Sequence, residues 1–297
     1  MNIPVVFSTD HNFVMPTGVA IHSLLRHSKQ RNYSIFVLEA DNVTEEDRQM
    51  LQSAVSPSNS TLTFIPMGNT FQGTFEIRGI TYPTYYRLLI PWLLPQFDKV
   101  LYLDGDIVVK SDISEMYDIN LEENYLAAFK PYSYMVDACK DYAPTLGLDY
   151  KNYVNAGVLL INAELMRKDN LKDLFLDHSK KKYTFVDQDI LNIVCQGRIM
   201  DLNVKYNYPP HSDALWKPDE VIEPCIIHYA GPKPWNVFTY CWSDWYEAYK
   251  KSPFFTKELE SSVYNNTWNR NYKLRGVIGV VLKYFAPSLH KFVKNMK

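Results

Sequence analysis

Two aspartates separated by one glycine stand in an otherwise apolar stretch. Residues 99–110 read KVLYLDGDIVVK, so Asp104 and Asp106 lie among strand-like residues. In an extended chain, residues i and i+2 project to the same side. Two like charges beside a hydrophobic layer repel each other and lose hydration, so they need a cation or a raised pKa. A divalent metal meets that need, and an exposed Asp-Gly turn, with Gly105 in a hairpin, is the simpler alternative.

His228 stands at the end of another apolar run, PCIIHYAG. A lone histidine at such a position is more often a core residue with one hydrogen bond. Together with Asp104 and Asp106, however, it completes a set of two oxygen donors and one nitrogen donor. That set suits Mn²⁺, or Mg²⁺ as the alternative, better than Zn²⁺. The loop that follows contains Gly231 and Lys233, which offer a close backbone approach and a cation to a diphosphate.

Amides and carboxylates also open two further segments. The segment YVNAGVLLIN at 153–162 leads into a buried strand, so Asn155 is either a turn residue or a polar side chain that reaches into a cleft. The segment VDQDILN at 186–192 resembles a helix start, which Asp187 or its neighbour caps and Asp189 stabilises through the helix dipole. Helix capping by these aspartates gives no role to Gln188, which stands between them.

The motifs of several large enzyme classes are missing from the sequence. It contains no G-x-x-x-x-G-K-[ST], G-x-G-x-x-G, H-E-x-x-H or G-x-S-x-G. These motifs support ATPases, dinucleotide-dependent enzymes, zinc proteases and serine hydrolases respectively. All four classes therefore lose their usual sequence support.

The first 110 residues alternate between strand-like and helix-like segments. We expect strands at 3–8, 33–38, 61–66, 100–103 and 107–109, and helices at 11–27 and 44–55. This alternation predicts an α/β fold with a parallel sheet that is covered on both faces. Ligands of such sheets bind beyond the carboxyl ends of the strands. Asp10, Asp104 and Asp106 all follow strand-like runs, so they are expected to converge on that edge.

Composition indicates a folded protein without membrane-spanning segments. With 297 residues, 46% hydrophobic and 22% charged, the chain can bury a large core, which excludes a disordered or collagen-like chain. Its first ten residues do not resemble a signal peptide, and its four cysteines form no C-x-x-C pair. We therefore expect a cytoplasmic protein with reduced cysteines.

The C-terminal end differs in charge from the rest. The chain has a formal charge of −2, yet all charged residues from Ser261 to Lys297 are basic. Aromatic and aliphatic residues lie between these charges, a pattern typical of segments at an anionic membrane surface. A helix folded back on the acidic body is the alternative, and nucleic acid is not an expected partner. We expect a catalytic domain at 1–262 and a basic aromatic tail at 263–297, with peripheral attachment to the inner face of the plasma membrane.

Six sequence blocks occur together in one order along the chain. They are FSTDHN at 7–12, TYYRL at 84–88, LYLDGDIVV at 101–109, NAGVLLIN at 155–162, DQDILN at 187–192 and HYAGPKPW at 228–235. Together they resemble glycosyltransferase family 8, whose members are retaining enzymes and include bacterial lipopolysaccharide galactosyl- and glucosyltransferases and glycogenin. The resemblance covers about residues 3 to 236. It implies a GT-A fold, in which a Rossmann-like, mixed and mainly parallel sheet is flanked by helices, here with a basic helical tail.

The resemblance also implies a role for each matching residue. Asp104, Asp106 and His228 would bind the metal that bridges the diphosphate of a UDP-sugar. The implied donor-binding residues are Ser8, Asp10 and Asn12 at the uridine, Ile80 on the base, Arg87 at the phosphates and sugar, Gly105 beside the metal ligands, Asn155, Ala156 and Gly157 at the sugar, and Gly231 and Lys233 over the diphosphate. Asp187 and Gln188 would hold the sugar hydroxyls and the reacting face. Since an amide is a poor nucleophile, Gln188 favours same-face attack, with Asp187 as the reserve nucleophile.

The expected reaction is Mn²⁺-dependent transfer of galactose or glucose from a UDP-sugar to a glycan or glycolipid, in surface polysaccharide or lipopolysaccharide-type biosynthesis. A glycosylated surface protein is the next acceptor considered, and a non-catalytic UDP-sugar-binding protein is a further alternative. A sugar-phosphate nucleotidyltransferase would need a glycine-rich loop after the first strand, where FSTDHN stands instead. An inverting transferase would need a carboxylate base, for which Asp213, Asp219 and Glu220 are candidates.

Overall fold

A seven-stranded sheet forms the centre of the protein. The computed structural model describes residues 2–29, 31–56, 58–76, 81–130, 139–210, 222–237, 239–258 and 260–261. The strands are β1 (Ile3–Thr9), β2 (Tyr33–Glu39), β3 (Thr61–Pro66), β4 (Lys99–Leu103), β6 (Leu126–Ala128), β7 (Val158–Asn162) and β8 (Ile199–Asp201), in the spatial order β3-β2-β1-β4-β7-β6-β8. Only β7 runs antiparallel to its sheet neighbours, so the sheet is mixed and mainly parallel, which confirms the expected GT-A fold class.

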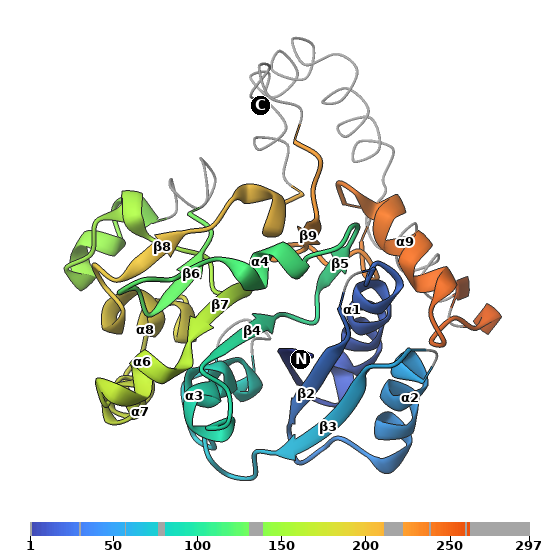
Figure 1. Cartoon of the computed structure of the whole chain (residues 1–297), viewed down its shortest axis with the longest axis horizontal. Coiled ribbons are helices and arrows are strands. Elements are labelled where there is room, and N and C mark those ends of the chain that lie inside the picture. The colour runs from blue at the N-terminus through green and yellow to red at the C-terminus, as the bar shows by residue number, and fades with distance from the viewer. Residues whose placement is uncertain are drawn as a thin grey trace, which may run out of the picture.

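Helices cover both faces of this sheet (Figure 1). The α-helices are α1 (Val14–Arg26), α2 (Glu45–Val55), α3 (Ile90–Leu93), α4 (Ser114–Asp118), α6 (Ala163–Lys168), α7 (Lys172–Ser179), α8 (Val186–Val194) and α9 (Trp242–Lys251). The 3₁₀ helices are η1 (His11–Phe13), η2 (Tyr82–Leu89), η3 (Ala143–Leu146), η4 (Tyr150–Asn152) and η5 (Val204–Tyr206). The helix expected at 11–27 is thus a 3₁₀ turn followed by α1. Thr44 caps α2 in a capping box with Asp47.

Alternate residues of each central strand belong to two different cores. In β4, Leu101 and Leu103 belong to the core that includes apolar residues of α1 and α9, whereas Val100 and Tyr102 belong to the core that includes residues of η2, α3, α6, α7 and α8. Side chains of a strand alternate between the faces of the sheet, and a strand covered on both sides is therefore apolar throughout. This two-sided burial holds the carboxyl ends of β1 and β4 rigidly in place.

A second, two-stranded sheet lies at the carboxyl edge of the large one. It pairs β5 (Ile107–Val109) antiparallel with β9 (Ile226–His228), with Ile107 opposite His228. The pairing joins segments more than a hundred residues apart in sequence, so local patterns could not predict it. It places the end of β9 beside the turn that follows β4.

The expected membrane-associated tail at 263–297 lies outside the described residues, as do the candidate bases Asp213, Asp219 and Glu220. Among the residues that are described, no helix is both long and apolar enough to cross a bilayer. The four cysteines are free thiols.

Candidate active site

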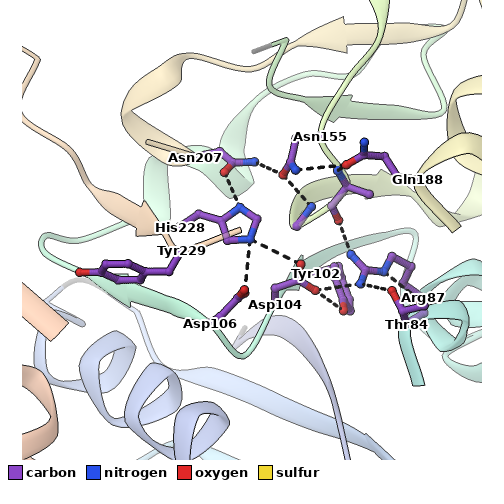
Figure 2. Close-up of polar contacts among 12 residues, drawn as sticks. Thr84, Arg87, Tyr102, Asp104, Asp106, Asn155, Gln188, Asn207, His228 and Tyr229 are labelled. Carbon is purple, nitrogen blue, oxygen red and sulfur yellow. Dashed lines mark hydrogen bonds and ion pairs between the residues drawn. The ribbon is translucent and has the colours of Figure 1, made fainter. Parts of the chain in front are cut away.

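Three strand ends bring Asp104, Asp106 and His228 together. Asp104 follows β4 directly, Asp106 immediately precedes β5, and His228 is the last residue of β9. One potential ligand atom from each lies within 4.8 Å of the other two (Figure 2). Because β4 and β5 belong to different sheets, the Asp-Gly-Asp segment is a crossing between sheets and not a hairpin turn. The hairpin alternative is therefore wrong.

Each carboxylate has one oxygen anchored by a cation and the other turned toward the histidine. Asp104 Oδ1 accepts a hydrogen bond from the Tyr102 hydroxyl at 2.7 Å and pairs with Arg87 Nη2 at 2.9 Å. Its Oδ2 lies 3.6 Å from His228 Nε2. Asp106 Oδ2 accepts from Lys233 Nζ, and Asp106 Oδ1 lies 3.3 Å from His228 Nε2. Two free carboxylate oxygens and one ring nitrogen thus face a common centre.

The residues at this centre fit a divalent cation. Asp106 Oδ1 is buried and has no hydrogen-bond partner among the described residues, a costly arrangement for a charged oxygen unless a cation satisfies it. Burial would raise the pKa of Asp106, but the ammonium of Lys233 outweighs burial and holds this pKa well below its usual range, so the side chain is an ionised carboxylate. The mixed oxygen and nitrogen donors suit Mn²⁺ or Mg²⁺ with remaining positions for other ligands.

Two glycines at the site stand where a side chain would not fit. A Cβ on Gly157 would lie 2.1 Å from His228 Cε1 and 2.7 Å from both Asp104 Oδ2 and His228 Nε2. A Cβ on Gly105 would lie 2.4 Å from Thr17 Oγ1, so the Asp-Gly-Asp crossing packs directly on α1. Any larger residue at position 157 would therefore fill the space between the candidate ligands.

Arg87 connects the candidate metal ligands to the start of α8. Its side chain is only 6% exposed, and its guanidinium carbon lies 4.4 Å from the centroid of the Tyr102 ring. Besides Asp104, it contacts Asp187 Oδ2 through Nε at 2.9 Å and donates from Nη1 to the Ala156 carbonyl at 2.6 Å. Arg87 therefore links the Asp-Gly-Asp segment, the start of α8 and the backbone at position 156. Its expected reach to the donor phosphates stays a prediction.

Gln188 is held by two donors at its carbonyl oxygen. Gln188 Oε1 accepts from Asn155 Nδ2 at 3.1 Å and from the Ala156 backbone N–H at 3.2 Å, and Gln188 Nε2 lies 3.3 Å from the Tyr153 hydroxyl. Asn155 is buried and has both of the roles considered, since its Oδ1 accepts from the Gly157 N–H two residues on and its Nδ2 donates to Gln188. A carbonyl oxygen that accepts two hydrogen bonds is a fixed dipole and a poor nucleophile.

The start of α8 differs from the prediction. Helix α8 has no side-chain cap from Asp187, whose Oδ1 instead accepts from the Thr84 hydroxyl at 2.6 Å. Asp189 Oδ2 accepts from the Phe185 backbone N–H at 2.7 Å and so serves the N-terminal turn from inside the helix. Burial raises the pKa of Asp187 to about 6, against the opposing effect of Arg87. Asp187 is thus occupied by long-range contacts that a local capping pattern does not predict.

The residues expected at the uridine lie at the neighbouring strand end. Ser8 is in β1, and Asp10 caps η1 by accepting from the Phe13 N–H at 3.0 Å and also accepts from Thr81 Oγ1 at 3.0 Å. Asn12 is exposed in η1, and Gly231 is exposed in the turn after β9. Ile80 lies outside the described residues. Lys233, five residues after the end of β9, donates to the Asp106 carboxylate.

Sequence patterns missed several side chains that hold the site together. They are Thr84, Tyr102, Tyr153 and Asn207, and Asn207 Oδ1 lies 2.8 Å from His228 Nδ1. Tyr102 alone had a local signal, since it stands two residues before Asp104 on the same strand side. Thr84 lies three residues before Arg87 but 103 residues from Asp187, and Tyr153 and Asn207 lie far in sequence from their partners, so spacing could not identify these contacts.

Comparisons with known proteins place the chain in one enzyme family. The family model of glycosyl transferase family 8 matches residues 4–239. Lipopolysaccharide 1,3-galactosyltransferase of Salmonella typhimurium is 28% identical over 96% of this chain and 85% of its own length. Lipopolysaccharide glucosyltransferase WaaO of Escherichia coli is 25% identical over 99% of this chain and 91% of its own length. The crystal structure of galactosyltransferase LgtC in complex with donor and acceptor sugar analogues is similar with a TM-score of 0.73 at 26% identity, over 88% of this chain and all of that one.

Proposed function

Since this chain belongs to glycosyltransferase family 8, we propose that it is a retaining hexosyltransferase that moves galactose or glucose from a UDP-sugar to a glycan or glycolipid with Mn²⁺ as its metal. GT-A glycosyltransferases of this kind use a nucleotide-sugar donor and a divalent metal. The observation that carries the proposal is the convergence of Asp104, Asp106 and His228, in which each carboxylate keeps one oxygen free. The galactosyl- and glucosyltransferase relatives support the choice of donor sugars.

Asp104, Asp106 and His228 would hold the metal, which supplies Lewis-acid stabilisation of the diphosphate as it leaves. When the bond between the anomeric carbon and the phosphate oxygen breaks, the electron pair stays on the diphosphate. Lys233, whose ammonium lies at Asp106, is placed to balance this charge. Asp106 would thus bind the metal ion, and the ammonium of Lys233 would approach the leaving diphosphate.

Retention of the anomeric configuration follows in this proposal from attack on the same face that the diphosphate leaves. The acceptor hydroxyl would form the new bond, and its proton would pass to the departing phosphate oxygen. The two hydrogen bonds at Gln188 Oε1 support this route, because they keep the amide as a fixed dipole near the sugar. Asp187 remains the reserve nucleophile: its Oδ1 accepts from Thr84, whereas its Oδ2 lies 2.9 Å from Arg87 Nε and accepts no hydrogen bond among the described residues.

We place the acceptor in surface polysaccharide or lipopolysaccharide-type biosynthesis, because curated relatives that match nearly the whole chain act on lipopolysaccharide. The basic aromatic segment 263–297 would bring the enzyme to such a membrane-held acceptor at the inner face of the plasma membrane. Removal of this segment should leave UDP-sugar hydrolysis unchanged and weaken binding to anionic vesicles. Unchanged vesicle binding would overturn the assignment of the tail.

A UDP-release assay with a panel of UDP-sugars tests the proposed reaction. We expect slow UDP release from one hexose donor in the presence of Mn²⁺, with no release in EDTA or with Asp106→Asn. Anomeric analysis of a transferred product would then show the α-configuration of the donor. Absence of UDP binding by the wild-type protein would overturn the proposed function.

A further inference from the structure

The metal-facing nitrogen of His228 needs a free lone pair. His228 is 3% exposed, and its Nε2 lies 3.3 Å from Asp106 Oδ1 and 3.6 Å from Asp104 Oδ2. A neutral imidazole carries one proton, so Nε2 can bind a cation only when that proton is on Nδ1. Which nitrogen holds it depends on the group that faces Nδ1. In this protein that group is the side-chain amide of Asn207, at 2.8 Å.

Two backbone N–H groups determine which way the neighbouring amides are turned. The Gly157 N–H donates to Asn155 at 3.0 Å and the Ala156 N–H donates to Gln188 at 3.2 Å. A backbone N–H can only donate, so the side-chain atom that each one meets must be the carbonyl oxygen. With Asn155 Oδ1 and Gln188 Oε1 assigned in this way, Asn155 Nδ2 donates to Gln188 Oε1 at 3.1 Å. The two assignments are mutually consistent.

The same logic extends to Asn207. Asn155 Oδ1 is an acceptor, and the Asn207 atom at 2.9 Å from it must therefore be the amide nitrogen. The other atom of this amide, the oxygen, then faces His228 Nδ1 (Figure 2). The polar chain runs from the backbone at positions 156 and 157 through Asn155 and Asn207 to His228, and all three side chains are buried.

We infer that Asn207 is a positioning residue for the metal site: its carbonyl oxygen holds the proton of His228 on Nδ1, and the Nε2 lone pair is thereby kept toward Asp104 and Asp106. The inference rests on the proposed function, since it assumes that these side chains bind a divalent cation. Partners of this kind orient a metal-binding histidine, and their loss typically lowers metal affinity by about 10- to 100-fold. Without Asn207, the carboxylates beside Nε2 become the remaining acceptors for the ring proton, which competes with the metal.

Two substitutions separate this role from a merely structural one. Asn207→Leu removes the acceptor for Nδ1–H and also the donor to Asn155. Asn207→Asp removes the same donor but keeps an oxygen that can accept from Nδ1–H. We expect Mn²⁺ affinity, measured by electron paramagnetic resonance of the free ion, to fall about 10- to 100-fold in Asn207→Leu and to stay near the wild-type value in Asn207→Asp.

The matched control is Asn124→Leu, which removes an amide that donates to the Leu121 carbonyl just before β6, at the opposite edge of the sheet. It should bind Mn²⁺ like the wild type. A second readout uses ¹⁵N-histidine labelling with Mg²⁺ in place of the paramagnetic ion. The wild type should show one slowly exchanging Nδ1–H signal that disappears in His228→Gln, and in Asn207→Leu this proton should exchange rapidly.

The outcomes distinguish the inference from the proposed function. If Asp106→Asn abolishes Mn²⁺ binding, the metal site is real. Equal losses of Mn²⁺ affinity in Asn207→Leu and Asn207→Asp, or wild-type affinity in both, would then overturn the positioning role of Asn207 alone. If the wild-type protein binds no Mn²⁺, or if Asp106→Asn binds it as the wild type does, the proposed metal site itself is wrong.

Discussion

Replacement of Lys233 by methionine should change two affinities in opposite directions. Lys233 Nζ donates to the Asp106 carboxylate and, at 2.9 Å, to the Tyr229 carbonyl. The Asp106 side chain is 7% exposed and that of Lys233 is 28% exposed, so this ion pair is largely shielded from solvent. In the absence of nucleotide, Lys233 therefore neutralises the carboxylate that the metal needs.

The expected magnitudes follow from the energy of such a contact. A hydrogen bond to a charged group contributes about 1.5–3 kcal/mol, and each 1.4 kcal/mol is about a tenfold change in affinity. Lys233→Met keeps an apolar stem and removes the competing ammonium, so Mn²⁺ without nucleotide should bind about 10- to 100-fold more tightly. With saturating Mn²⁺, UDP should bind about 10- to 100-fold more weakly, because the diphosphate loses a cation.

Electron paramagnetic resonance measures the first affinity and titration calorimetry the second. Lys110→Met is the matched control, because Lys110 also pairs with an aspartate, Asp244, but lies at the far end of β5. It removes the same charge and should change neither affinity by more than a small factor. Weaker Mn²⁺ binding by Lys233→Met, or unchanged UDP binding, would refute the assignment of Lys233 to both groups.

Three further substitutions have defined outcomes. Gly157→Ala should weaken Mn²⁺ binding about 100-fold, since its methyl group would lie 2.7 Å from Asp104 Oδ2 and His228 Nε2, and wild-type affinity in the same resonance assay would contradict this. Arg87→Lys should lower kcat for UDP release about 100-fold, because one ammonium cannot hold Asp104, Asp187 and the Ala156 carbonyl together. An unchanged kcat would show that Arg87 does not link these groups. Burial raises the pKa of Asp187 from 3.8 to about 6. The stability that the folded protein gains from protonation of Asp187 is therefore fully present below about pH 4 and is lost as the pH rises through about 6. The free energy of unfolding of Asp187→Asn should therefore rise relative to that of the wild type by about 2–3 kcal/mol between pH 4 and pH 7, and a parallel pH dependence in urea denaturation would exclude this shift.

The sequence predicted the parts of the site that lie at strand ends. Asp104 and Asp106 stand in an apolar strand context, and the alternation of strands and helices placed them at the carboxyl edge of the sheet. His228 could be added because it ends a second apolar run. These inferences succeeded because burial on both faces of a sheet leaves a strong local pattern.

The contacts between distant side chains could not be predicted in the same way. Asn207 lies 21 residues from His228 and 52 from Asn155, and its amide has no local pattern to distinguish it. Asp187 looked like a helix cap because aspartates are common there, yet its carboxylate accepts from Thr84 and forms an ion pair with Arg87. Such pairings depend on how whole elements pack, which spacing along the chain does not record.

Crystals grown with Mn²⁺ and UDP would test the central claim most directly, through anomalous diffraction from the metal. The account predicts one anomalous peak bonded to Asp104, Asp106 and His228 and to oxygens of the UDP diphosphate. Bound UDP with no peak between these three side chains, or a peak at another site, would contradict it.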